Sequence, residues 1–302
     1  GFFEDLTRWM EADNSKPLER IRPSVLRQMQ KNGGIYRLPL TYTILTYAAD
    51  PEQLSDNKPE TVLRASEQGG EEFYPFAFNL DYSPQMAERC AIDYVDAAQG
   101  TCNFECDSFY AQLALLRRQK AALDTLPKNL DVADIRDGLL YYYVILSADS
   151  IVYQPGRYGY PELKQSVYYA YPSDHDGGCQ LEFGSLLSIN TQSEQKSGAW
   201  AFLSYLLSDA CQQSVNYLPV SDTVLQEQFA QLLAEETVTQ EDIDTFYTLV
   251  DHAQKLDYPT EPIEQIIEEE MAAYLDGVID EKTTAERIQS RAGLYLMEQK
   301  VE

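Results

Sequence analysis

Residues 166–221 read SVYYAYPSDHDGGCQLEFGSLLSINTQSEQKSGAWAFLSYLLSDACQQSVNYLPVS. The opening SVYYAYP is β-branched and aromatic and ends at Pro172, which predicts a buried strand. Gly177-Gly178 predicts a polar loop, and LLSIN at 186–190 predicts a second short strand. A helix is predicted from Ser197 to Gln213, because apolar residues recur there with a 3.6-residue period. The apolar face of this helix is predicted to comprise Ala199, Phe202, Leu203, Leu206, Leu207 and Ala210.

The order of these elements resembles one family, the extracellular solute-binding proteins of ABC importers, which includes maltose-binding protein. The matching motifs are Tyr171-Pro172, Ser188-Ile189-Asn190, Ser197-Gly198-Ala199-Trp200-Ala201-Phe202, Leu206-Leu207-Ser208, Gln212 and Pro219-Val220. The family's usual glutamate after the tryptophan is Ala201 here. The resemblance implies an α/β, helix-rich, two-lobe fold of the type II periplasmic-binding-protein class.

The C-terminal residues carry a second resemblance, to the final helical pair of bacterial solute-binding lipoproteins. Its motifs are Ile266-Ile267, Glu269-Glu270, Tyr274, Gly277, Thr284-Ala285-Glu286, Ile288-Gln289-Ser290-Arg291, Tyr295-Leu296 and Glu298. The resemblance implies that the chain lacks the N-terminal part of lobe one, because Gly1–Leu6 resembles a segment that normally follows several β-α units. We therefore expect residues 1–40 with 183–235 to form a partial lobe one. Residues 41–182 with 236–302, which include the C-terminal helices, are expected to form lobe two.

The remaining periodic segments predict further elements of an α/β protein. Residues 40–47 alternate and are β-branched, which predicts a strand, and residues 139–152 predict a buried strand or a strand–helix junction. Asp107 or Ser108 is expected to cap one of the helices, and capping-box spacings begin two others, at Thr239 and Thr283. Helices are predicted at 2–12, 21–31, 60–68, 84–94, 107–120, 220–235, from 239, at 263–275 and from 283.

Composition limits the classes of partner. The chain has 302 residues and a net charge of −26, from 23 Lys and Arg against 49 Asp and Glu. Such a field repels nucleic-acid phosphates and anionic lipid headgroups, so neither is expected as a partner. No run of eighteen apolar residues occurs and no signal peptide heads the chain, so a membrane anchor is not expected within it.

The cysteines and histidines do not form a recognisable metal motif. The five cysteines are Cys90, Cys102, Cys106, Cys179 and Cys211, and the only histidines are His175 and His252. Cys102 and Cys106 have no second Cys or His pair nearby, so we expect no zinc site and no metal. Buried free thiols are expected instead, and no cofactor is predicted.

Candidate catalytic groups are better explained as structure. Glu268, Glu269 and Glu270 point in different directions on one helix and cannot flank one bond, so a solvated helix face is expected. Asp174-His175-Asp176 lies beside two glycines and predicts a turn. No G-x-S-x-G elbow and no phosphate-binding glycine loop occurs. We therefore expect no enzymatic activity.

The resemblance implies where a ligand binds and what the protein does. The resemblance places three segments near an inter-lobe cleft. These are the crossing strand, one residue of the aromatic run 141–143 and the loop before the return strand. The expected ligand contacts are Thr41, Tyr42, Thr43, Tyr142, Glu182 and Phe183. The implied function is capture of a small polar solute, a sugar or oligosaccharide first and a peptide second, for delivery to the transmembrane subunits of an ABC permease. The implied location is extracellular, as a cell-surface lipoprotein, or periplasmic.

Two other functions remain open at this stage. One is a ligand-sensing or protein-interaction domain on the same fold, which needs no transporter. The other is a hydrolase, which would require an acid and a base converging on the cleft.

Overall fold

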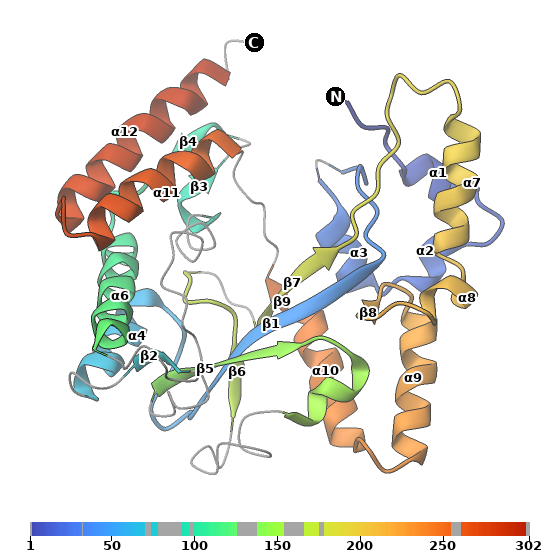
Figure 1. Cartoon of the computed structure of the whole chain (residues 1–302), viewed down its shortest axis with the longest axis horizontal. Coiled ribbons are helices and arrows are strands. Elements are labelled where there is room, and N and C mark those ends of the chain that lie inside the picture. Colours follow the sequence, from blue (N-terminus) through green and yellow to red (C-terminus); the bar gives the residue numbers. More distant parts are fainter. Residues whose placement is uncertain are drawn as a thin grey trace. The chain divides into compact units, whose positions relative to one another are not determined.

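The computed structural model describes residues 2–31, 33–69, 74–77, 92–96, 99–125, 138–153, 166–174, 178–254 and 261–299. Its contacts divide the chain into two compact units (Figure 1). Unit 1 comprises Gly1–Leu45, Tyr143–Gly159 and Gly178–Lys255, and unit 2 comprises Thr46–Tyr142, Tyr160–Gly177 and Leu256–Glu302. The contact-based division places 143–159 and 236–255 in unit 1, whereas the predicted lobe one lacked them. The lobe boundaries themselves stay a prediction.

Unit 1 combines helices with part of a sheet. Its helices are α1 (Thr7–Ala12), α2 (Pro17–Arg20), α3 (Pro23–Met29), the 3₁₀ helix η3 (Ala148–Tyr153), α7 (Lys196–Leu206), α8 (Asp209–Gln212), α9 (Asp222–Ala234) and α10 (Gln240–Asp251). Its strands are the first half of β1 (Thr41–Ala49), the end of β5 (Gly138–Ile145), β7 (Cys179–Gly184), β8 (Leu218–Pro219) and β9 (Ala253–Gln254). β1 pairs antiparallel with β7 and β8, and β7 pairs parallel with β9.

The N-terminal segment of unit 1 packs against residues that follow β7. Isolated backbone bridges join Phe3 to Asn190 and Leu38 to Leu187. The rings of Trp9 and Trp200 lie 6.2 Å apart, and the indole of Trp200 donates a hydrogen bond of 3.0 Å to Asp13. Segments far apart in the sequence therefore share one core within this unit.

Two predictions in the 166–221 stretch are wrong. The predicted strand 186–190 forms only isolated bridges, whereas residues 179–184 of the predicted loop form β7. The helix ends at Leu206 and a separate short helix follows Ser208. Its buried residues are Trp200 and Leu203, and the side chain of Phe202 is 58% exposed. Burial of Trp200, which the predicted face omitted, rotates the apolar stripe away from Phe202.

A charged network joins three helices of unit 1. Arg22, which precedes α3, forms a forked pair with Asp251 at the end of α10, with N–O distances of 2.7 and 2.5 Å. The same guanidinium lies 3.9 Å from Asp222 and 4.2 Å from the centre of the Tyr247 ring. The hydroxyl of Ser24 also donates to Asp251 at 2.9 Å. The hydrogen bonds from Arg22 hold the pKa of Asp251 below its ordinary value of 3.8.

Asp251→Asn is expected to lower the free energy of unfolding of unit 1 by about 0.5–1 kcal/mol at pH 7, because the pair with Arg22 is forked but Asp251 is exposed to screening solvent. A depressed pKa stabilises the fold above the ordinary pKa and loses that effect as the pH falls through the folded pKa. The difference from wild type should therefore shrink below pH 3.8. Urea unfolding at several pH values measures it. Asp244→Asn, on the exposed face of the same helix, is the control, and equal effects of both variants would contradict the prediction.

Unit 2 is built around a long helix and the C-terminal helical pair. Its helices are α4 (Pro59–Gln68), η1 (Ile92–Tyr94), α6 (Asp107–Asp124), α11 (Glu261–Leu275) and α12 (Glu281–Gln299). Its strands are the second half of β1, β2 (Tyr74–Ala77), β3 (Val95–Asp96), β4 (Thr101–Cys102), the first part of β5 and β6 (Val167–Tyr169). β1 pairs antiparallel with β6, β2 pairs parallel with β5, and β3 pairs antiparallel with β4.

Most predicted elements of unit 2 are confirmed. The helices expected at 60–68, 107–120 and 263–275 correspond to α4, α6 and α11, and residues 139–152 form a strand followed by a 3₁₀ helix. In the other unit, the capping box between Thr239 and Asp242 is also present. Most of the helix predicted at 84–94 lies outside the described residues, and its last residues form η1.

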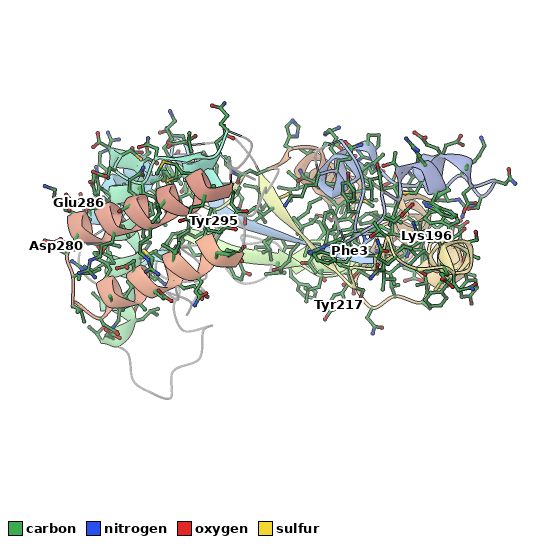
Figure 2. The ribbon with its side chains drawn as sticks, turned by 90° about the horizontal axis from the view of Figure 1, so that it is seen from above. Phe3, Lys196, Tyr217, Asp280, Glu286 and Tyr295 are labelled. Atoms are coloured by element: carbon green, nitrogen blue, oxygen red, sulfur yellow. The ribbon has the colours of Figure 1, made fainter. Side chains whose placement is uncertain are left out.

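Two helix starts in unit 2 differ from prediction. The N-cap of α6 is Cys106, whose side chain makes no capping bond, and not Asp107 or Ser108. α12 begins before Thr283, because Asp280 accepts a hydrogen bond of 2.8 Å from the Thr283 amide and so takes the capping role. Asp280 lies in the turn between α11 and α12, which run side by side (Figures 1 and 2). The capping box expected from Thr283 is therefore wrong.

Candidate ligand-binding site

Five of the six predicted ligand contacts lie on two paired strands of unit 1. In the antiparallel register of β1 and β7, Thr43 lies opposite Glu182 and Tyr42 opposite Phe183. Thr41 lies opposite Gly184. The sequence placed Glu182 and Phe183 in a loop, whereas the structure pairs them directly with the crossing strand. The five residues therefore form one continuous patch of sheet.

The register separates these five side chains into two sets. Paired residues share a face of the sheet, and successive residues alternate between faces. Thr41, Thr43 and Glu182 consequently belong to one face, and Tyr42 and Phe183 to the other. The first face carries two hydroxyls and a carboxylate, which are suited to hydrogen bonds with a hydroxylated ligand. One ligand can contact only one of the two sets.

Burial distinguishes the members of the two sets. Glu182 is exposed and Thr43 and Phe183 are partly exposed, whereas Thr41 and Tyr42 are buried. Burial raises the pKa of Tyr42 well above its ordinary value of 10, and the nearby carboxylate of Asp222 adds to the shift. Solvent reaches the polar face mainly at Thr43 and Glu182, so a ligand on this face would meet these two residues first.

At the end of the polar face, β7 approaches β1 closely at Gly184. A Cβ atom added to Gly184 would lie 2.7 Å from the hydroxyl oxygen of Thr41, which is shorter than a normal contact. Glycine at this position allows β1 and β7 to pair up to Thr41. On its other side, Thr41 lies opposite Pro219 of β8.

Tyr142, the sixth predicted residue, belongs to β5 and to unit 2. Its ring lies 5.4 Å from that of Tyr47, and its side chain is half-buried. The neighbouring Tyr141 and Tyr143 are buried, and the Tyr143 hydroxyl donates to the carbonyl of Ser150 at 2.6 Å. Tyr142 is therefore the most accessible ring of the 141–143 run, and it belongs to a different unit from the other five residues.

A charged network near Tyr42 was not predicted from the sequence. Arg22, Asp222 and Tyr247 all influence the pKa of Tyr42. Burial also raises the pKa of Tyr247, and Asp222 contributes to the rise. These residues lie far apart in the chain, and only the packing of α3, α9 and α10 brings them together. Their short-range pairing indicates a structural role in supporting β1.

Candidate metal and redox sites were tested in the described part of the chain. No group of three or more His, Cys, Asp or Glu is placed there to hold a metal ion. Four cysteines are free, and Cys179 is buried. Cys102, Cys106 and Cys211 are partly exposed, so the prediction of buried thiols holds for Cys179 alone. Cys90 and the Asp174-His175-Asp176 turn beyond its first residue lie outside the described residues.

Cavities lie within each unit among the described residues. One, of about 280 Å³, lies in unit 2 between α4, α6 and the start of α12. The other, of about 230 Å³, lies in unit 1 between η3, residues 215–217 and α9. Neither is lined by any of the six predicted residues.

Among the helices that the structure describes, none is long and apolar enough to cross a membrane.

The fold was compared with known proteins. A solute-binding protein of an ABC transporter from Agrobacterium radiobacter, in complex with ribitol, superposes with a TM-score of 0.63 at 13% identity, over 98% of this chain and 80% of that one. The sugar-binding protein MalE from Xanthomonas citri gives 0.60 at 13%, over 99% and 80%. A solute-binding protein from Thermotoga lettingae, bound with α-D-tagatose, gives 0.57 at 12%, over 98% and 81%.

Comparison of the sequence finds no match, whereas comparison of the structure finds similar folds. No protein-family model matches the chain, and no curated protein matches it. The solved structures extend over nearly the whole chain and are maltose-binding-protein-like solute-binding proteins of ABC transporters. At these identities the likeness establishes the fold and not the ligand. The chain therefore has the α/β fold of the two-lobe, type II periplasmic-binding-protein class, as predicted from its sequence.

Proposed function

We propose that this protein is a non-catalytic, extracellular solute-binding protein that captures a sugar or polyol and delivers it to an ABC permease. The observation that supports the proposal is the similarity over nearly the whole chain to proteins solved with ribitol and tagatose. The motifs of residues 166–221 and 263–298 point to the same class independently of the coordinates. Folds host many functions, so the ligand has to be argued from the site.

The polar face of β1 and β7 supplies the ligand chemistry in this proposal. Thr43 donates and accepts hydrogen bonds, and Glu182 accepts from ligand hydroxyls, which is a strong, charge-assisted contact. Tyr142, in unit 2, is proposed separately as an accessible aromatic ring for the C–H face of a sugar. Thr41 extends this face in the proposal, and Tyr42 and Phe183, on the opposite face, support the two strands. A ligand bound by such groups needs no catalytic base, cofactor or metal.

Delivery and location are part of the same proposal. Solute-binding proteins of this fold work outside the cytoplasmic membrane, so we propose a cell-surface lipoprotein or a periplasmic protein. The net charge of −26 is consistent with a partner surface that is not anionic. The partners would be the transmembrane subunits of the permease and the solute, with no nucleic acid.

Calorimetric titration of the full chain with ribitol, D-tagatose and maltotriose tests the proposal. We expect at least one of the three to bind, and Glu182→Ala to weaken that binding by about tenfold or more, because a hydrogen bond to a charged group contributes about 1.5–3 kcal/mol. Thr43→Val, which keeps the shape and removes the hydroxyl, should weaken it by a smaller factor.

The matched control is Glu194→Ala, which removes an exposed carboxylate of the same unit away from the sheet. It should bind as wild type does. Absence of binding for all three solutes would contradict the sugar or polyol proposal. Binding that survives both Glu182→Ala and Thr43→Val unchanged would contradict the assignment of the site.

A further inference from the structure

The cavity of unit 1 is a concave site that the proposed function does not use. It has a volume of about 230 Å³ and lies between η3, residues 215–217 and the middle of α9. This is below the roughly 300–1,000 Å³ typical of pockets for drug-sized ligands, so it suits a molecule of about one ring. The polar residues that line it are Ser147, Asp149, Asn216, Tyr217, Gln228 and Gln231.

The walls of this cavity are held in place by backbone and side-chain bonds. The amide of Leu218 donates to the carbonyl of Leu146 at 3.0 Å, which fixes the segment 215–217 against the start of η3. The hydroxyl of Ser147 donates to Asp149 at 2.6 Å and lies 2.7 Å from the hydroxyl of Ser150. Ala148 is buried and forms part of the lining. The backbone at 215–217 and the Asp149 side chain are therefore positioned before any ligand arrives.

The lining groups are those that recognise hydroxyls. A primary amide donates and accepts at once, and a carboxylate accepts from two directions. Among the described residues, the structure records no hydrogen-bond partner for the side chains of Asn216 and Gln228. Gln231 is already oriented by its bond of 2.9 Å to Glu235. Adjacent hydroxyls of a sugar or polyol present the alternating donors and acceptors that these groups require.

An aromatic ring completes the lining. Tyr217 is 50% exposed and lies on the surface of unit 1 (Figure 2). A half-exposed ring beside amides offers a flat apolar face for the C–H side of a sugar ring. The only formal charge among the lining residues is Asp149, in a chain of net charge −26. This charge disfavours anionic ligands such as sugar acids and phosphates.

We propose that this cavity is a second binding site, specific for one neutral sugar ring or polyol. Asn216 and Gln228 bind vicinal hydroxyls, Asp149 accepts from a third, and Tyr217 stacks on the apolar face. None of these residues belongs to the polar face of β1 and β7. The second site therefore binds whether or not the first does, and it adds an accessory sugar contact to the surface of unit 1.

The methyl group of Ala148 provides a local probe of the cavity. Full-length protein labelled at alanine methyls is titrated with D-glucose, with ribitol and with D-glucuronate, and Ala148→Ser assigns the signal. We expect the Ala148 methyl to shift with half-saturation near about 1 mM for a neutral ligand, as for a site with few contacts. D-glucuronate should shift it less at equal concentration, because its carboxylate is repelled by Asp149.

Matched variants locate the binding. Tyr217→Ala and Gln228→Ala should each raise the half-saturation by about fivefold or more, since each removes one stacking or hydrogen-bonding contact. Tyr205→Ala, a similarly exposed tyrosine on α7, and Gln226→Ala, two residues earlier on α9, should leave it unchanged. Glu182→Ala should also leave it unchanged, which separates this site from the one under Proposed function.

Three results would overturn the inference. One is an Ala148 signal that does not move with D-glucose or ribitol at about 50 mM, far above the expected half-saturation. Another is a shift that survives Tyr217→Ala and Gln228→Ala with the same half-saturation. The third is a shift with D-glucuronate equal to that with D-glucose.

Discussion

Replacing Phe109 by alanine is expected to lower the free energy of unfolding of unit 2 by about 3–5 kcal/mol. Phe109 lies in the first turn of α6 and is 1% exposed. Its ring meets Tyr94 at 5.0 Å and Phe104 at 5.1 Å, both edge to face. Alanine would leave a cavity beside the two remaining rings and remove both contacts, each of which adds about 0.5–1.5 kcal/mol beyond area burial.

A graded series separates the cavity from general damage to the helix. Phe109→Leu keeps most of the side-chain volume. It should therefore lower the free energy of unfolding by less than Phe109→Ala does, because cores tolerate volume-conserving changes better than truncations. Leu294→Ala removes an exposed side chain of α12 and should change stability by no more than about 0.5 kcal/mol. Urea unfolding followed by circular dichroism measures all three. A cost for Phe109→Ala no larger than that for Leu294→Ala would contradict the assignment of Phe109 to the core.

Elements with long periodic patterns were predictable from the sequence. Helix α6 keeps Phe109, Leu113 and Leu116 on one buried face, as its 3.6-residue spacing indicated. β1 was predictable because its β-branched residues alternate, and the Thr239 capping box because its signal is local. In each case the signal that predicts the element lies within one short continuous segment of the sequence, which is the range over which periodicity predicts secondary structure.

Elements that depend on pairing were not predictable to the same extent. The first three residues of β7, Cys179 to Leu181, are all buried, yet the strand directly follows a glycine pair that indicates a loop. The strand was recognisable only after its pairing with β1 had set the register. The same register decides that Thr43 and Glu182 share a face while Tyr42 turns into the core. A sequence motif alone therefore identifies candidate residues but does not show which face of the sheet their side chains occupy.

The fold and the ligand are supported by different kinds of information. Motifs in residues 166–221 and 263–298 identified the fold class, and comparison with solved structures confirmed it at 11–16% identity. Ligand contacts depend on a few side chains and vary freely within one fold. For this reason the two sugar-binding proposals rest on local chemistry, Thr43 with Glu182 on the sheet and Tyr217 with Gln228 at the cavity.

The three glutamates at 268–270 are not all solvated, which differs from the prediction. A solvated face was expected for all three glutamates, whereas Glu270 is 8% exposed. Its carboxylate accepts hydrogen bonds from Arg291 at 2.7 Å and Arg287 at 3.4 Å, both on α12. Arg291 also reaches Glu269 at 2.6 Å. The pairing joins two helices across a turn, so no spacing within either helix reveals it.

Arg291→Met is consequently expected to lower the free energy of unfolding of unit 2 by about 2–3 kcal/mol at pH 7. Loss of one partner of a buried pair costs about 3–5 kcal/mol, and the partial exposure of Arg291 and the remaining contact with Arg287 reduce this value. Met keeps the length and the apolar stem of the side chain, so the variant tests the charge and not the packing. Arg287→Met, which removes the longer of the two contacts, should cost less.

The pH dependence of the Arg291 effect gives an independent check. Hydrogen bonds from Arg291 hold the pKa of Glu269 below its ordinary value of 4.5. A lowered pKa stabilises the folded state above the ordinary value, and the contribution disappears as the pH falls through the folded pKa. The wild-type advantage over Arg291→Met should therefore shrink below pH 4.5. Glu270→Gln combined with Arg291→Met should recover part of the lost stability, because it removes a buried charge that would otherwise keep only the longer contact with Arg287. A double variant less stable than Arg291→Met, or a stability difference independent of pH, would show that the pair does not hold α12 on α11 as described.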